Sequence, residues 1–410
     1  MILLFLTSGL FLGWSLGAND ASNVFGSAVG SKMVSFRKAA IIASVFVILG
    51  AVIQGAGASD TLGKLGAVNA IGGSFTVALA AAITVYMMTK FALPVSTTQA
   101  IVGAIIGWNL FTGNSTDSKA LSQILITWVS GPVIGALFAI LLYILVKKFK
   151  RSARIHLIRF ESIIKKGLII VGAFGAYSLG ANNIANVMGV FIPAFSLQEL
   201  SFGIFSLNSS QQLFLLGGIA IAIGILTYSK KVMETIGGNI VELSAEAALV
   251  VVLAESLVLF IFSSSGLSSL FVKIGLPPIP MVPVSSSQVV VGCVLGIGLY
   301  KGVRNINFRI LGEIALGWLA TPVASGLLAF FSLFFMKNIF GINVGFTTGV
   351  RTTMLSTDQG ISNDISGIFK YLLMGILIFG TIGTIYFLLL ERKKRKDLQR
   401  SEERFWMNMK

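Results

Sequence analysis

Long runs of apolar residues, separated by short polar stretches, recur along the whole chain. Runs of about 20 residues match the length of a helix that crosses the bilayer core. Residues 68–111 fit either two spans or one re-entrant hairpin, and the same holds for 242–300. The pattern predicts an all-α polytopic membrane protein with about 11–12 transmembrane segments. The expected spans are 2–29, 38–58, 68–90, 94–111, 120–146, 163–193, 211–228, 242–264, 283–300, 310–336 and 366–390.

Composition supports this fold class and narrows the chemistry. Of the 410 residues, 55% are hydrophobic and 11% are charged, which no soluble domain of this size matches. The opening apolar run lacks a basic start and a small-residue cleavage site, so we expect a retained span. The single cysteine, Cys293, and the single histidine, His156, exclude a disulfide framework and a Cys- or His-ligated metal site. No nucleophile–base pair is visible, so we expect no enzyme and no cofactor.

Lysine and arginine are distributed unevenly between the two sides of the predicted spans. One alternate set of connections carries 25 of them and the other carries six. The richer side is expected to be cytoplasmic. The N-terminus is then outside and the C-terminus inside the cell membrane, and the net charge of +15 reflects topology instead of nucleic-acid binding.

The basic segment 147–166 divides the chain. Its charges alternate with apolar residues, as in an amphipathic helix on the cytoplasmic leaflet, although a plain basic loop fits almost as well. The predicted domains are a first membrane repeat, this linker, a second membrane repeat, an external connection, a last transmembrane helix and a basic cytoplasmic tail, at 1–146, 147–166, 167–336, 337–365, 366–390 and 391–410.

Three landmarks occur twice in the same order. The first is Leu-Gly-Ala-Asn, at 16–19 and 179–182. The second is Pro-Val followed by three hydroxyl residues and Gln, at 94–99 and 283–288. The third is Trp with Pro four residues later, beginning at 128 and 318. The offsets of 163, 189 and 190 residues place about 26 extra residues in the second copy.

The charge count gives the two copies opposite directions through the membrane, because the span with Asp20 runs inward and the span with Asn183 runs outward. Inverted repeats of this kind are typical of secondary transporters, whose site lies at the repeat interface near the midplane. No Walker A sequence is present. We therefore favour ion-coupled transport by alternating access, with an anion channel as the alternative from another class.

Each Pro-Val segment predicts a helix N-terminus, with proline in the first turn and hydroxyl residues as caps. Two such ends would offer free N–H groups and partial positive charge to one tetrahedral oxyanion. The alternative is that these residues only cap and pack. The candidate anion-binding residues are Ser96, Thr97, Thr98, Gln99, Ser285, Ser286, Ser287 and Gln288.

The two Gly-Ala-Asn segments suit a hard monovalent cation. Asp20 and Asn23, like Asn183 and Asn186, are three residues apart and share one helix face. The glycine ahead of each segment allows a helix break that would free backbone carbonyls. Carboxylate and amide oxygens favour an alkali ion. The expected ligands are Asp20, Asn23, Asn183 and Asn186, with Asn19 and Asn182 as further candidates, unless the segments are only polar helix contacts.

Four segments, GANDASNVFGSAVGSK, PVSTTQAIVGA, GANNIANV and PVSSSQVVVG, resemble the inorganic phosphate transporter family of sodium- or proton-coupled symporters. The resemblance covers about residues 1–336 and implies phosphate as the anion, a monovalent cation as the driver and a homodimer. The chain departs from the family in having Asn183 where Asp is common, and Gln99 and Gln288 where His is common. These departures favour sodium over a proton and leave sulfate open as the anion.

We therefore predict a sodium-coupled phosphate symporter. A sulfate permease on the same scaffold and proton-coupled phosphate transport are the alternatives. Three membrane carboxylates, Glu242, Glu246 and Glu255, could line a pathway or pair with interfacial lysine, and the sequence does not decide between these roles.

Overall fold

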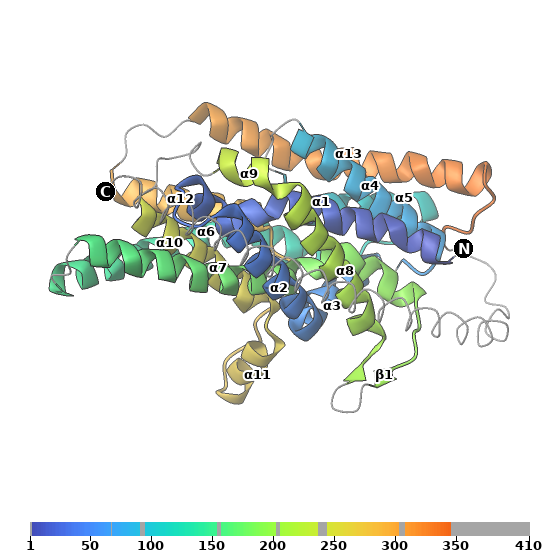
Figure 1. Ribbon diagram of the computed structural model, residues 1–410. Helices are drawn as coiled ribbons and strands as arrows, with labels where there is room; N and C mark the ends of the chain where they lie inside the picture. The colour runs from blue at the N-terminus through green and yellow to red at the C-terminus, as the bar shows by residue number, and fades with distance from the viewer. Residues whose placement is uncertain are drawn as a thin grey trace, which may run out of the picture. The chain divides into compact units, whose positions relative to one another are not determined.

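The computed structural model describes residues 2–66, 68–90, 95–153, 157–201, 206–236, 244–302 and 308–345. One compact unit, residues 1–196 with 207–350, contains all the described helices (Figure 1). The predicted span 366–390 and the tail 391–410 lie outside the described residues, as does 337–365 beyond residue 345.

The described residues of the first half of this unit form six helices. They are α1 (Ile2–Gly30), α2 (Phe36–Gln54), α3 (Ala56–Gly66), α4 (Ile71–Lys90), α5 (Thr97–Thr112) and α6 (Ser118–Ala153). The predicted span 38–58 is interrupted, because α2 ends at Gln54 and α3 begins two residues later. Gly55 separates the two helices, and any side chain there would overlap Ile184 of the second half.

The second half repeats much of this order and adds elements. Its helices are α7 (Leu157–Met188), the 3-10 helix η1 (Gly189–Ala194), α8 (Ser209–Thr227), α9 (Ser229–Ile236), α10 (Ala245–Ser263), α11 (Ser265–Lys273), α12 (Ser286–Tyr300) and α13 (Phe308–Asn338). Two short strands, β1 (Leu200–Ser201) and β2 (Ser206–Leu207), pair with each other.

Seven described helices are long and apolar enough to cross a membrane, namely α2, α4, α6, α7, α8, α10 and α13. The predicted all-α polytopic fold class is confirmed. In α6 and α13 only 22% of the apolar window is buried inside the protein, against 67% in α7 and α8. Residues such as Val129 and Leu319 point outward along the first pair. The described protein therefore leaves most of the apolar surface of these two helices uncovered.

Helices α5 and α12 are too short to cross a bilayer alone. They contain 16 and 15 residues, or roughly 23 Å of helix, against a hydrocarbon core of about 30 Å. Each packs on a longer helix of the opposite half, α5 on α13 and α12 on α6, and Figure 1 shows α5 lying alongside α13 (orange).

The contacts between the halves are reciprocal. A Cβ atom at Gly103 would overlap the Pro322 carbonyl oxygen, and one at Gly292 would overlap the Pro132 carbonyl oxygen. The glycines are 189 residues apart and the prolines are 190 apart, so the second contact is the first with the two copies exchanged. At these landmarks the backbones of the two halves are thus in close contact. The inversion of the copies relative to the membrane stays a prediction.

Contacts between α1 and α8 and between α7 and α2 are related in the same way, with the two copies exchanged. Gly17 of α1 packs on the Ile221 backbone of α8, and Gly180 of α7 packs on the Val47 backbone of α2. Ile221 minus Val47 is 174, whereas Gly180 minus Gly17 is 163. The 26 extra residues of the second copy therefore divide into 11 before α8 and 15 between α8 and α12.

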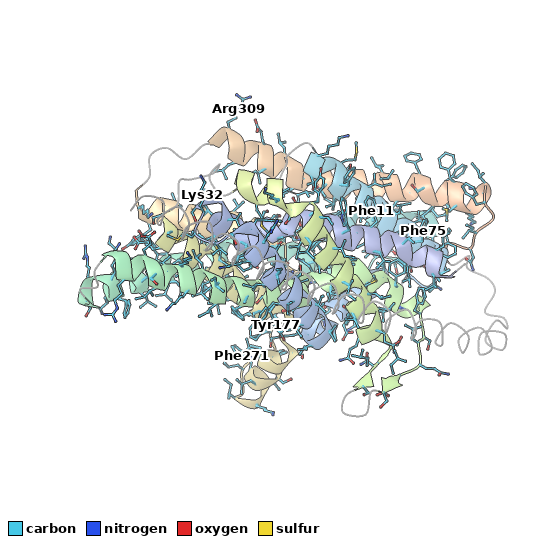
Figure 2. All side chains as sticks on the ribbon, viewed as in Figure 1. Phe11, Lys32, Phe75, Tyr177, Phe271 and Arg309 are labelled. Atoms are coloured by element: carbon cyan, nitrogen blue, oxygen red, sulfur yellow. The ribbon has the colours of Figure 1, made fainter. Side chains whose placement is uncertain are left out.

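The two additions have identifiable structures. The first contains the β1–β2 pair, and the second contains α11. Figure 1 shows α11 projecting from the other helices of its unit, and Phe271, labelled in Figure 2, lies on it. Neither addition contributes a residue to the polar network described below.

The basic segment 147–166 forms no element of its own within the described residues. Its first part continues α6 to Ala153, and its last part is the start of α7 from Leu157. Lys150 in this segment forms an ion pair with Glu246 at the start of α10, with a distance of 3.0 Å between Nζ and Oε2.

Candidate ion-binding site

The two Gly-Ala-Asn segments lie in uninterrupted helices, so the predicted helix breaks are wrong. Helix α1 runs from Ile2 to Gly30 and α7 from Leu157 to Met188. The glycines serve close packing instead, because Gly17 and Gly180 each receive the backbone of a helix from the opposite half. Side-chain oxygens, and not carbonyls freed by a break, are therefore the available ligands in these segments.

Asp20 is the centre of a buried polar network and is 2% exposed. Its Oδ1 accepts a hydrogen bond from Asn19 Nδ2 at 2.9 Å. Its Oδ2 accepts from Ser286 Oγ at 3.1 Å and from Asn183 Nδ2 at 3.4 Å. One carboxylate thus joins α1 to α7 and to the start of α12, which lie far apart in the sequence.

The second asparagine of each segment reaches a hydroxyl residue of the opposite half. Asn23 Nδ2 donates to Ser286 Oγ at 3.3 Å, and Asn186 Nδ2 donates to Thr98 Oγ1 at 2.9 Å. Asn186 also donates to Asn183 Oδ1 at 3.1 Å, across the three-residue spacing predicted to share a helix face. The four motifs therefore meet in one place.

The first asparagine of each segment holds the chain leading into a short helix of its own half. Asn182 Nδ2 donates to the Val284 carbonyl oxygen at 2.7 Å, and Val284 N–H donates to Asn182 Oδ1 at 2.9 Å. Asn19 Nδ2 donates to the Val95 carbonyl oxygen at 3.5 Å. These contacts fix where α12 and α5 begin.

Both hydroxyl runs start helices, as predicted. Ser96 Oγ accepts from Gln99 N–H at 3.2 Å and caps α5, while Ser285 Oγ accepts from Gln288 N–H at 3.4 Å and caps α12. The expected position of proline was wrong at the second end, because Pro283 precedes the cap by two residues instead of occupying the first turn. Pro94 lies outside the described residues.

Several polar atoms beside these caps have no hydrogen-bond partner in the described protein. They are Thr97 Oγ1, Gln99 Oε1, Gln288 Oε1 and Asn186 Oδ1. Leaving a buried polar group unpaired costs about 1–3 kcal/mol. Two helix N-termini with unpaired polar atoms form a setting in which a bound polar ligand would recover that cost.

All fourteen candidate residues from the sequence are buried, and most belong to the hydrogen-bonded network. They are Asn19, Asp20, Asn23, Ser96, Thr97, Thr98, Gln99, Asn182, Asn183, Asn186, Ser285, Ser286, Ser287 and Gln288. Thr97, Gln99 and Gln288 are neighbours in the sequence of residues that belong to this network. Each of the three has a buried side-chain oxygen without a hydrogen-bond partner in the described protein. Their roles as ligands stay predictions.

Sequence reasoning left undecided one buried carboxyl group. Glu255 of α10 is 1% exposed, and neither of its carboxyl oxygens has a hydrogen-bond partner. Its neighbour in the same helix, Glu246, pairs with Lys150 at the protein surface, and Glu242 lies outside the described residues. The sequence feature that could have singled out Glu255 is its position deep in an apolar run, nine residues after the surface carboxylate Glu246.

The arrangement fits a known family. The model of the phosphate transporter family matches residues 16–329, which include all four motifs. This chain belongs to the phosphate transporter family. It is accordingly a multi-pass membrane transporter and not an enzyme.

Named relatives and a solved structure agree with this assignment. The transporter is 28% identical to a Thermococcus kodakarensis protein named "Putative phosphate permease", over 80% of this chain and 96% of that one. It is 26% identical to a Methanocaldococcus jannaschii protein of the same description, over 79% and 94%. A solved structure of "The sodium-dependent phosphate transporter" shares the fold, with a TM-score of 0.63 and 22% identity over 82% of this chain and 99% of that one.

Proposed function

We propose that this transporter takes up inorganic phosphate together with sodium by alternating access. The observation that carries the proposal is the buried meeting of two capped helix N-termini with one carboxylate, Asp20, supplied by the two halves of the chain. Anion-binding and cation-binding groups next to each other suit symport, because each ion lowers the cost of burying the other.

Phosphate fits the anion side better than sulfate does. Phosphate carries O–H donors as well as acceptor oxygens near neutral pH, whereas sulfate offers only acceptors. The unpartnered carbonyl oxygens of Gln99 and Gln288 are acceptors that phosphate could satisfy. A donor-only site would not reject sulfate, but a buried acceptor left without its donor costs about 1–3 kcal/mol.

Sodium fits the cation side. Asp20 is the one carboxylate in the four motifs, and amide oxygens of Asn23, Asn183 and Asn186 lie on the same helix faces. No histidine occurs in these motifs to carry a proton. The solved relative gives further support, since that protein is described as a sodium-dependent transporter. Sodium acts here as a cotransported substrate, and no cofactor is required.

The same proposal includes orientation and assembly. The lysine and arginine distribution favours an external N-terminus and a cytoplasmic C-terminus in the cell membrane. The two halves are inverted repeats that rock about the site. The family resemblance favours a homodimer.

Uptake into proteoliposomes containing the purified transporter tests the proposal. Labelled phosphate should accumulate against its gradient only when sodium is higher outside, and a pH gradient alone should drive little uptake. Arsenate, which has the same shape and similar ionisation, should compete with phosphate, and excess sulfate should compete poorly. Transport driven by a pH gradient without sodium would overturn the cation assignment. Sulfate displacing phosphate at comparable concentration would favour a sulfate permease.

A further inference from the structure

A cavity lies where α1 ends and the chain turns into α2, and the transport chemistry above does not use it. Its volume is about 430 Å³. Figure 2 labels Lys32, which lies on the connection between the two helices. The cavity is lined by Val29, Lys32, Met33, Val34, Ser35, Phe36, Lys38, Lys165 and Ile169. None of the fourteen residues of the candidate ion-binding site lines it, so it is a separate feature of the molecule.

The charges that line this cavity are all positive. Lys32, Lys38 and Lys165 are exposed, and no carboxylate is among the lining residues. Glu161 lies one turn before Lys165 in α7, but no ion pair joins the two in the described protein. Three cationic side chains around one hollow concentrate positive potential there, which favours an anionic ligand.

The start of α2 adds to this potential. The first amide groups of a helix have no partner within the helix and carry partial positive charge. Ser35 occupies the cap position, and its side chain forms no capping hydrogen bond with them. The last carbonyl groups of α1, which would repel an anion, already accept N–H groups from the connection itself. The backbone therefore reinforces the attraction that the lysines provide.

Lys32 holds an unusual backbone conformation at the edge of the cavity. Its φ of 59° lies in the left-handed region, and no other non-glycine residue in the described part of the chain has a positive φ. This conformation costs about 1–2 kcal/mol for a residue with a side chain. Strained residues of this kind are often found at binding sites. Here the strained position brings a cationic side chain to the cavity.

The cavity joins the two halves of the chain. Lys32 and Lys38 belong to the first half, and Lys165 belongs to the second, at the start of α7. Helices α2 and α7 pack on each other. An anion bound by lysines of both halves would therefore link them. The lysine and arginine count places all three lysines on the predicted cytoplasmic side.

A phosphate group matches this lining better than a carboxylate does. A phosphate monoester carries a charge of about −1.5 to −2 near pH 7 and offers three acceptor oxygens. Lysine ammonium groups and the amides at a helix start are both common phosphate ligands. Apolar lining residues such as Met33, Phe36 and Ile169 leave room for an uncharged part of the ligand.

We propose that this cavity binds a phosphate group from the cytoplasmic side, as a second anion site separate from the transport site, and that the bound anion slows transport by linking the two halves. The phosphate group belongs either to free inorganic phosphate or to the headgroup of a lipid such as phosphatidic acid. The binding is independent of the proposed function, and only the slowing of transport rests on it.

Thermal unfolding of the purified protein in detergent tests the binding. One series contains increasing inorganic phosphate, and another contains increasing phosphatidic acid in the micelles, with phosphatidylcholine as its reference. The wild type is compared with Lys165→Gln and with Lys166→Gln. Lys166 is the next residue of α7, is also exposed and does not line the cavity, so its variant loses the same charge elsewhere. All three proteins keep the transport site, so its contribution cancels.

Lys165→Gln should need a probe concentration at least about tenfold higher for the same rise in unfolding temperature, because a hydrogen bond to a charged group contributes about 1.5–3 kcal/mol. Lys166→Gln should respond as the wild type does. Lys38→Gln removes a charge contributed by the first half and should weaken binding in the same way. This variant gives the same test if Lys165→Gln does not fold.

The two probes distinguish the sources of the phosphate group. A difference between Lys165→Gln and Lys166→Gln with inorganic phosphate identifies free phosphate as a ligand, and the same difference with phosphatidic acid identifies the lipid headgroup. Either result supports the site. Equal responses of the two variants to both probes overturn it, since the lysines would then act only as general surface charge. That result leaves sodium-coupled transport intact.

Initial rates of phosphate uptake into proteoliposomes test the slowing of transport. The effective probe is placed inside the vesicles if it is inorganic phosphate, or in the bilayer if it is phosphatidic acid. It should slow the wild type and Lys166→Gln more than Lys165→Gln. Equal inhibition of all three proteins overturns the proposed link between the halves. Uptake by the wild type without sodium overturns the proposed function instead, and the unfolding measurements still decide whether the cavity binds phosphate.

Discussion

The two Gly-Ala-Asn segments have the same spacing and different charge, and the structure uses them differently. Asp20 of α1 accepts three hydrogen bonds, including one from Asn183 of α7. Asn183 accepts from Asn182 and Asn186 and donates to Asp20. The second copy therefore serves as a donor to the first, and a symmetric scaffold carries an asymmetric site.

The contacts of the preceding asparagines, Asn19 and Asn182, with the backbone also differ between the two copies. Asn182 exchanges two hydrogen bonds with the Val284 backbone, at 2.7 and 2.9 Å, whereas Asn19 makes one at 3.5 Å with Val95. The uncharged copy is thus held more firmly to its short helix than the charged copy is. This contrast suggests that the second copy positions the site and the first copy supplies its charge.

Removing the charge should have the largest effect. Asp20→Asn keeps the shape of the side chain but deletes the carboxylate of the four motifs, so sodium-dependent phosphate uptake should fall to background while the protein still folds. Uptake and thermal unfolding of the purified variant are measured together. Normal sodium dependence in a folded Asp20→Asn protein would remove Asp20 from the ion site.

Exchanging the charge between copies sharpens the same test. In the double variant Asp20→Asn with Asn183→Asp, the carboxylate moves to the side chain that contacts Asp20 at 3.4 Å. Part of the sodium-dependent uptake should return. No recovery would mean that the hydrogen bond from Ser286, which reaches only the first copy, is required.

The glutamines should have the next largest effect. Gln99→Leu and Gln288→Leu each remove a buried acceptor near a helix N-terminus, so phosphate transport should fall roughly ten- to a hundredfold, corresponding to about 1–3 kcal/mol. Competition by sulfate should rise relative to phosphate. Initial transport rates of phosphate and of sulfate are measured for each variant. Equal losses for the two anions would argue against anion selection by these acceptors.

The two positioning asparagines should differ in stability. Asn182→Leu leaves the Val284 N–H unpaired and leaves its carbonyl oxygen with only the 3.5 Å hydrogen bond from Thr98 Oγ1, so it should destabilise the protein by about 1–3 kcal/mol. Asn19→Leu loses one long backbone contact, to Val95, and the hydrogen bond to Asp20 Oδ1. Asn182→Leu loses the corresponding hydrogen bond to Asn183 Oδ1 as well as both backbone contacts to Val284, so Asn19→Leu should cost less than Asn182→Leu. Thermal unfolding in detergent compares the two, and equal losses would contradict the stronger role assigned to the second copy.

Orientation can be tested with changes that should leave transport unaltered. In a Cys293→Ala background, cysteines replace Ser152, at the end of α6, and Ser115, in the α5–α6 connection. A membrane-impermeant reagent should reach position 152 only from the cytoplasmic side and position 115 only from outside. Labelling of both from one side would refute the predicted inversion of the repeats.

The sequence by itself determined the fold class, the position of most of the helices and the candidate residues of the site. The length of an apolar run indicates whether it can cross the membrane, because the run must match the thickness of the bilayer core. Such a run must be helical, because unpaired backbone groups are excluded from lipid. Paired landmarks fixed the repeat, and the fourteen polar residues stood out because polar groups are costly at that depth. Each of these signals is local or depends on order along the chain alone.

Only the tertiary structure decided how the copies are used. Gly17 and Gly180 could equally have broken their helices, but the backbone of an opposing helix occupies the space beside each one. Whether Glu255 faces water, a lysine or the protein interior likewise depends on how α10 packs, because the sequence pattern is the same in all three cases. Such outcomes depend on contacts between segments that lie far apart along the chain, and no local pattern encodes them.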